Sequence, residues 1–181
     1  MLKYILLGFL NYQPMTGYEL KSIIDNSTMH FWHAYHSQIY TMLRKLEDDG
    51  LLVSEVDDEA DKLNRRTYTI TAAGQHELQA WLATSMANVA PVKEELLVRV
   101  FFSAQRANAD ILDELRHQRR LHQNQLNEYR ALAPDHLQDR YDSATQRDAL
   151  FWSSTLKFGI AYEEMYLAWL DQLITTLESQ A

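Results

Sequence analysis

The spacing of apolar residues along the chain predicts that it is mostly helical. In residues 37–49, Ile39, Leu43 and Leu46 recur at helical intervals and leave the opposite side of the helix polar. Gly50 follows, and glycine is the residue that most often ends a helix. We expect the N-terminal part of the chain to be arranged around this helix.

Two shorter helices are expected before it. Residues 4–10 are almost wholly apolar, which predicts a buried helix. A second helix begins after Thr16, because Thr16 and Glu19 have the spacing of a capping box. The break between this helix and the one at residues 37–49 is short, so the three helices predict a helix-turn-helix.

A β-hairpin is expected next. Residues 51–56 are partly β-branched, residues 57–64 are polar and turn-like, and residues 65–70 alternate as a strand does. In a winged helix-turn-helix, the hairpin that directly follows the DNA-recognition helix is called the wing. The hairpin expected here follows the helix at residues 37–49, so we interpret it as a wing. Thr71 then predicts the cap of a fourth helix at residues 72–84.

The rest of the chain has helical spacing only. Residues 85–91 lack a pattern and end in proline, so we place a linker there, between domains at 1–84 and 92–181. Helices are expected in the second domain at about residues 92–105, 108–132 and 143–177. The predicted fold is mainly α with a small β-hairpin: an N-terminal winged helix-turn-helix and an all-α C-terminal dimerisation domain.

The last predicted helix carries a wide apolar surface, more than one short neighbouring helix can cover. Exposed apolar patches of that size are rare on monomers, so we expect a second copy of the chain to cover it. The predicted dimer contacts are Leu156, Ile160, Leu167, Leu170, Ile174 and Leu177. A second stripe beside them contains Phe151, Phe158, Tyr162, Met165, Trp169 and Leu173.

Composition narrows the class of protein. The chain has no cysteine, which excludes disulfides, thiol catalysis and cysteine-ligated metals and fits a reducing compartment. No apolar run approaches the roughly 20 residues of a membrane span, so a cytoplasmic protein is expected. The net charge of −8 argues against a protein that coats nucleic acid non-specifically, because such a protein needs a broad basic surface. It is compatible with a sequence-specific DNA-binding protein that has a local basic patch.

The polar side of residues 37–49 has the residue types that bind DNA. Gln38 suits adenine, Arg44 and Lys45 suit phosphate or guanine, and Ser37 can donate to a phosphate at the helix start. The predicted DNA contacts are Tyr18, His36, Ser37, Gln38, Tyr40, Arg44 and Lys45, joined by Lys62, Arg65 and Arg66 of the hairpin. The alternative is that the polar side of this helix is simply exposed to solvent and binds nothing. For Tyr18, the alternative is a tyrosine packed within the protein.

Several of these motifs together resemble a known family. The segments TGYEL at 16–20, FW at 31–32, HSQIY at 36–40, GL at 50–51 and RRTYTIT at 65–71 with Gly74 look like the PadR family of bacterial winged-helix regulators. The helical remainder is similar in layout to the longer members, which include phenolic-acid-responsive repressors and virulence-gene activators. The resemblance implies a homodimer on double-stranded DNA, with half-sites of a near-palindromic operator about 34 Å, or a multiple, apart.

The resemblance also implies a repressor, because most family members of this type repress transcription. Some of them release DNA when a small aromatic acid binds. Five aromatic side chains are the candidates for such an effector pocket, although aromatics at helical spacing more often belong to a core or dimer interface. They are Phe101, Phe151, Trp152, Phe158 and Tyr162.

Other functions are weaker expectations. His30, His33 and His36 recur at a spacing of three, but no acid stands close, so neither a metal nor a cofactor is predicted. The chain lacks the phosphate-binding, nucleophile and metalloprotease motifs of common enzymes, so it is not expected to be an enzyme. An activator of the same fold without an effector, or a winged helix that binds proteins, stays open as an alternative.

Overall fold

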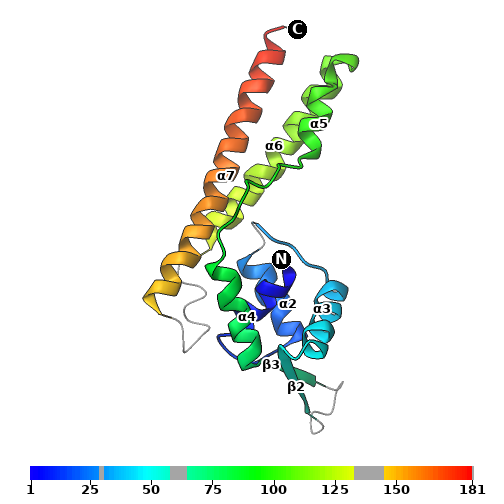
Figure 1. Cartoon of the computed structure of the whole chain (residues 1–181). Helices are drawn as coiled ribbons and strands as arrows, with labels where there is room; N and C mark the ends of the chain where they lie inside the picture. Colours follow the sequence, from blue (N-terminus) through cyan, green and yellow to red (C-terminus); the bar gives the residue numbers. More distant parts are fainter. Residues whose placement is uncertain (29–30, 58–64, 133–144, 181) are drawn as a thin grey trace. The chain divides into compact units, whose positions relative to one another are not determined.

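The computed structural model describes residues 1–28, 31–57, 65–132 and 145–180, which Figure 1 traces. Contacts divide the chain into two compact units. One contains the described residues up to Ala87, and the other begins at Asn88 and contains the two longest helices. No helix among the described residues has both the length and the apolar character that crossing a membrane requires.

The described part of the first unit is a helix-turn-helix with a small antiparallel sheet. Its elements are α1 (Leu2–Leu10), β1 (Met15–Thr16), α2 (Gly17–Ser27), α3 (His36–Asp48), β2 (Leu52–Asp57), β3 (Arg65–Ile70) and α4 (Ala72–Ala83). The strand order is β1-β3-β2, so the predicted hairpin of β2 and β3 gains a third strand. That strand was not predicted, because two residues are too short to show an alternating pattern.

Local sequence signals set the ends of these helices as expected. The backbone N–H of Glu19 donates to the Thr16 side chain, and the Glu19 carboxylate accepts the backbone N–H of Thr16, which completes the predicted capping box. Gly50 has a φ of 72°, the left-handed conformation that glycine adopts without a steric penalty. Thr71 caps α4 by accepting the backbone N–H of Gly74.

The core of the first unit lies between α1, α2, α3 and the sheet. Ile39, Leu43 and Leu46 of α3 are fully buried in it, as their spacing predicted. The start of α4 is docked on the turn after α3, where the Leu51 carbonyl accepts the backbone N–H of Thr71 at 3.0 Å. This hydrogen bond joins the start of α4 to the turn between α3 and β2.

The second unit is built on two long helices. Its described elements are α5 (Glu95–Phe101), the 3-10 turn η1 (Ser103–Gln105), α6 (Asn108–Ala131) and α7 (Gln146–Glu178). Helices α6 and α7 run antiparallel along each other (Figure 1). Arg116 pairs with Glu178 near one end, and Arg130 pairs with Glu164 toward the other.

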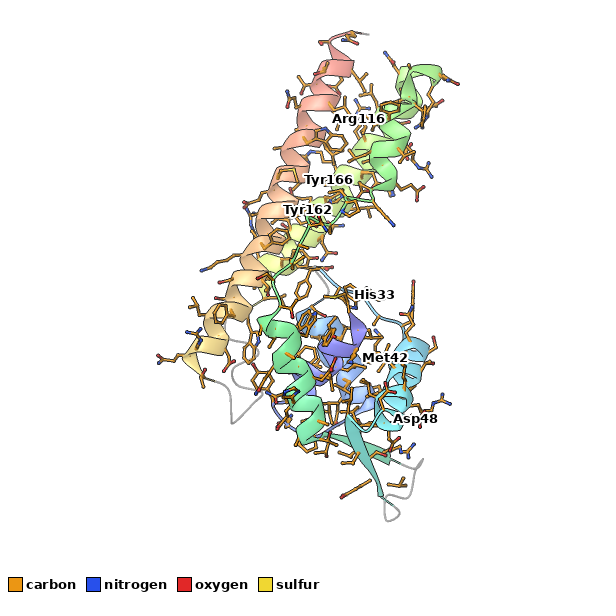
Figure 2. The ribbon with its side chains drawn as sticks, viewed as in Figure 1. His33, Met42, Asp48, Arg116, Tyr162 and Tyr166 are labelled. Carbon is orange, nitrogen blue, oxygen red and sulfur yellow. The ribbon has the colours of Figure 1, made fainter. Side chains whose placement is uncertain are left out.

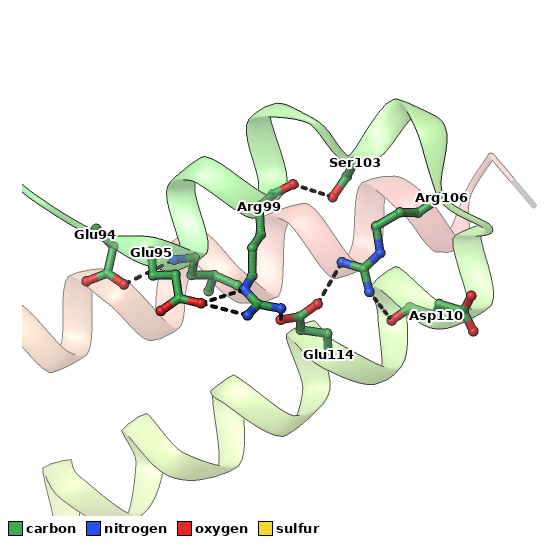
Figure 3. A network of polar contacts seen from close by, with 8 residues as sticks. Glu94, Glu95, Arg99, Ser103, Arg106, Asp110 and Glu114 are labelled. Carbon is green, nitrogen blue, oxygen red and sulfur yellow. Dashed lines mark hydrogen bonds and ion pairs between the residues drawn. The ribbon is translucent and has the colours of Figure 1, made fainter.

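The helix expected at residues 92–105 is shorter than predicted. It begins at Glu95 because the Glu94 side chain caps it by accepting the backbone N–H of Leu96. A network of charged side chains then holds α5 against the start of α6 (Figure 3). Arg99 contacts Glu95 and Glu114, and Arg106 binds the other oxygen of Glu114 at 2.6 Å.

The residues predicted as dimer contacts on α7 are largely buried within their own chain. Leu156, Leu167, Leu170 and Ile174 are at most 9% exposed, because they belong to the core of their own chain. Ile160 and Leu177 are half-buried. Helix α6 of the same chain covers this side of α7. Its own buried stripe contains Ile111, Leu112, Leu115, Leu126 and Tyr129.

Part of the second stripe of α7 is left open, whereas its members Tyr162, Trp169 and Leu173 are partly buried and pack against the core. Phe151, Phe158 and Met165 recur every seven residues and are 55%, 64% and 55% exposed. Seven residues are close to two helical turns, so the three side chains lie on one line along α7. This line, which we call the open stripe, is apolar surface that the described residues leave exposed.

Candidate nucleic-acid interface

The outward side of α3 presents a row of polar side chains. Ser37, Thr41, Arg44 and Lys45 are all exposed; Thr41 lies one helical turn after Ser37, and Arg44 and Lys45 lie one turn after Thr41. They lie opposite the buried side of the same helix, so none of them is needed for packing. Thr41 was missing from the predicted contacts, although its position four residues after Ser37 was the signal for it.

Arg44 and Lys45 are the free cations of this row. No hydrogen bond or ion pair is recorded for either side chain within the described residues, although the chain as a whole is acidic. Their charge is therefore not neutralised by a neighbouring carboxylate. A pair of uncompensated cations on one exposed helix face is suited to phosphate oxygens or to the acceptors of guanine.

Gln38 has a structural role that the sequence did not reveal. Its side-chain oxygen accepts the backbone N–H of Tyr35 at 3.1 Å, just before the helix begins. A bidentate pairing of Gln38 with adenine would need that oxygen to be released. The side-chain amide N–H groups of Gln38 are the part that is free to donate in this conformation.

Tyr40 and Tyr18 lie at the crossing of α2 and α3. A Cβ on Gly17 would come within 2.5 Å of the Tyr40 ring, so a larger residue at position 17 would require the ring to move. The Tyr40 ring lies 6.4 Å from that of His36 and nearly parallel to it. Tyr18 follows Gly17 and is 71% exposed. The predicted contacts His36 and Tyr40 therefore lie side by side on α3, and Tyr18 is exposed at the start of α2.

The wing contributes one described basic side chain. Arg66 lies 3.4 Å from the Glu47 carboxylate of α3 and is thus paired within the chain. Lys62 falls outside the described residues, and Arg65 is described only as the strand residue opposite Asp57. Burial raises the pKa of the Tyr68 phenol, while the nearby Arg66 guanidinium works in the opposite direction.

A groove of about 470 Å³ follows the flank of α3. Its lining extends from Lys45 and Met42 to His33, which precedes the helix; Figure 2 labels Met42 and His33. The charged or ionisable groups that line it are Lys45 and His33, without a carboxylate. Its lining therefore favours an anionic neighbour such as a phosphate.

The histidines considered as metal ligands are not assembled into a site. His33 packs edge-on against Tyr35 at 5.0 Å, and His36 lies over Tyr40. His30 falls outside the described residues. Within the part of the chain that is described, histidines and acids do not gather in groups of three or more.

The five aromatics predicted to line an effector pocket are not gathered in one cavity of the second unit. Phe101 is 80% exposed beside a groove of about 680 Å³ along α5. Phe151 and Phe158 belong to the open stripe, and Trp152 is half-buried. Tyr162 packs near Tyr166 with a ring distance of 5.8 Å, and burial raises its pKa. Phe101 lies on α5 and the other four lie on α7, so the five side chains come from two different helices.

Comparison with known proteins covers both units. The PadR-like transcriptional regulator family matches residues 6–80, which contain α2, α3 and the wing. The virulence activator alpha C-terminal family matches residues 92–178. The chain belongs to the PadR-like family of transcriptional regulators. This confirms the family and the fold class that the sequence motifs predicted.

Two comparisons reach the same relative. The negative transcriptional regulator PadR of Bacillus subtilis is 28% identical over 98% of this chain and 97% of its own length. The crystal structure of Bacillus subtilis PadR with operator DNA has a TM-score of 0.81 at 26% identity and covers 97% of this chain and 98% of that one. Its complex with p-coumaric acid has the same fold, with a TM-score of 0.76 at 24% identity over 98% of both chains.

Proposed function

We propose that this PadR-like regulator is a sequence-specific repressor that binds a near-palindromic operator as a homodimer. The observation that carries the proposal is the exposed row on α3, where Arg44 and Lys45 have no partner within the described residues. The Bacillus subtilis relative is named a negative transcriptional regulator and has been solved with operator DNA. Both facts support repression through DNA binding.

In this proposal α3 enters the major groove. Arg44 and Lys45 bind phosphate or guanine, and Ser37 and Thr41 donate to the backbone or to bases. His36, Gln38 and Tyr40, with Tyr18 of α2, border the same surface. Lys62 and Arg65 are proposed as wing contacts from the sequence alone.

The first test measures binding to DNA from upstream of the chain's own gene. Arg44→Ala is expected to weaken binding roughly 5- to 150-fold, because one good base or phosphate contact contributes about 1–3 kcal/mol. Arg120→Ala is the matched control, since Arg120 is an exposed arginine of α6 that has no partner among the described residues. Equal affinities for both variants in fluorescence anisotropy would contradict the assignment of α3 as the recognition helix.

The homodimer is proposed to form through the open stripe rather than through the leucines first predicted. Phe151, Phe158 and Met165 present the apolar surface that dimer interfaces bury. Phe158→Glu should shift the chain toward monomer in sedimentation equilibrium, because an unpaired charge at an apolar contact is costly. Thr175→Glu, at an exposed polar position of α7, is the control. A dimer unchanged by Phe158→Glu would place the interface elsewhere.

The effector is proposed to be a small aromatic carboxylate, which prefers a dimer conformation unsuited to the operator. The Bacillus subtilis relative has been solved with p-coumaric acid, so phenolic acids are the first compounds to test. The aromatic positions proposed to respond are Phe101, Phe151, Trp152, Phe158 and Tyr162. A compound that raises the melting temperature and releases DNA would support the proposal, whereas stabilisation without DNA release would count against it.

A further inference from the structure

The C-terminal end of α3 is joined to the wing by one carboxylate. Glu47 accepts a hydrogen bond of 2.5 Å from the Ser54 hydroxyl of β2 and lies 3.4 Å from the Arg66 guanidinium of β3. The same Glu47 oxygen makes both contacts. A single side chain of the recognition helix therefore holds both strands of the wing.

Strand register explains why these two residues meet Glu47. In the antiparallel pairing, Ser54 stands opposite Tyr68 and Val56 stands opposite Arg66. Directly paired residues lie on the same face of a sheet, and residues two apart share that face. Tyr68 is 3% exposed, so this face is the one turned toward the core. Ser54 and Arg66 are thereby directed to α3, where Glu47 is half-buried.

The pairing distinguishes Arg66 from the other basic residues of the surface. Its guanidinium faces Glu47 and lies 6.0 Å from the centre of the Tyr68 ring. Arg44 and Lys45 have no such partner within the described residues. A phosphate contact by Arg66 would have to compete with an existing carboxylate, so Arg66 is a poor source of uncompensated charge for DNA.

We propose that Glu47 is a positioning residue for operator recognition, which fixes the spacing between recognition helix and wing through Ser54 and Arg66. The inference rests on the proposed function, because it assigns roles within the same DNA-binding surface. It assigns Arg66 to this junction, in place of the DNA contact first predicted. The spacing matters for specificity because helix and wing must meet successive parts of one binding site together.

The experiment compares affinity for the operator with affinity for a random duplex of equal length. Glu47→Gln keeps an oxygen for Ser54 but removes the charge that holds Arg66. We expect the operator-to-random ratio to fall roughly two- to tenfold, the equivalent of one hydrogen bond of about 0.5–1.5 kcal/mol. Random-duplex binding should tighten, because a negative charge is lost and Arg66 is released.

Asp48→Asn is the charge-matched control. Asp48 is the next residue of α3, is exposed, and has no recorded partner among the described residues (Figure 2). Its loss should raise both affinities alike and leave their ratio unchanged. Arg66→Gln should lower the ratio as Glu47→Gln does, and the double variant should be no worse than either single variant, because both remove the same contact.

Two further readouts separate positioning from other roles. If Arg66 bound a phosphate, Arg66→Gln would reduce the slope of log K against log salt by about 0.9, whereas a junction residue leaves it unchanged. Unfolding midpoints of Glu47→Gln and Ser54→Ala show whether the ratio falls only with loss of fold, which would overturn the inference. An unaltered ratio in a stable Glu47→Gln variant would also overturn it. A wild-type chain without preference for the operator would instead overturn the proposed function.

Discussion

Gly74 offers a sharp test of how the first unit is held together. It lies in the first turn of α4, and a Cβ built there would come within 2.3 Å of the Leu51 carbonyl oxygen and 2.8 Å of the Ile70 side chain. The Leu51 oxygen is backbone and already accepts the N–H of Thr71. Gly74→Ala must therefore move the turn after α3 or lift α4 from it.

The size of the effect follows from three contributions. Overpacking costs about 1–3 kcal/mol, and loss of the hydrogen bond to Leu51 adds about 1 kcal/mol. Alanine in place of glycine in a helix returns about 0.5–1 kcal/mol. The free energy of unfolding should thus fall by about 2 kcal/mol. With a denaturant slope of about 1–3 kcal/mol per molar urea, the midpoint should drop by roughly 1 M.

Gly8 provides the matched control. It lies inside α1, and a Cβ there would meet nothing within 4 Å. Gly8→Ala should therefore raise the free energy of unfolding by about 0.5–1 kcal/mol, the opposite sign for the same chemical change. Urea unfolding followed by circular dichroism and tryptophan fluorescence measures both. Equal stability of the two variants, or a shift in the same direction, would refute the packing argument at Leu51.

Three other predictions use the same logic. Leu170→Ala should destabilise by about 2–5 kcal/mol because Leu170 is fully buried, whereas Phe158→Ala should change the monomer by less than about 0.5 kcal/mol in thermal unfolding. Gly17→Ala should turn the Tyr40 ring away from the helix crossing and weaken operator binding more than it lowers the unfolding midpoint. Burial raises the pKa of Tyr129 to about 12, so the native state holds a proton that the unfolded state loses near the ordinary tyrosine pKa of 10.0. Stability should therefore fall as pH rises from about 10 to about 12, and Tyr129→Phe should flatten that fall; an unchanged profile would contradict it.

Much of the first unit could be read from the sequence, because its signals are local. The Thr16 and Glu19 capping box, the turn at Gly50 and the cap at Thr71 depend only on neighbouring residues, and all three occur in the structure. The β3 strand also has its predicted bounds. The pairing of β1 with it could not be foreseen, since it depends on where the chain returns in space.

The sequence was least informative where two distant segments decide the outcome. Leu170 was expected at a dimer contact, yet α6 of the same chain covers it, because the sparse leucines of α6 form a stripe only once it packs. The side-chain oxygen of Gln38 already accepts the backbone N–H of Tyr35, and the Arg66 guanidinium is already paired with the Glu47 carboxylate. Helix periodicity shows which side of α3 is exposed, but it does not show which exposed groups are already bound within the chain.

The central claim is that free cations on α3 bind DNA phosphates or bases. The most direct measurement is the salt dependence of operator affinity for the wild-type chain, Arg44→Gln and the control Arg120→Gln. The slope of log K against log salt should decrease by about 0.9 for Arg44→Gln if it contacts phosphate, and stay unchanged for Arg120→Gln. If Arg44 reads guanine instead, its loss should lower operator affinity and leave random-duplex binding nearly unchanged. An Arg44→Gln variant with wild-type slope and wild-type operator preference would contradict the account.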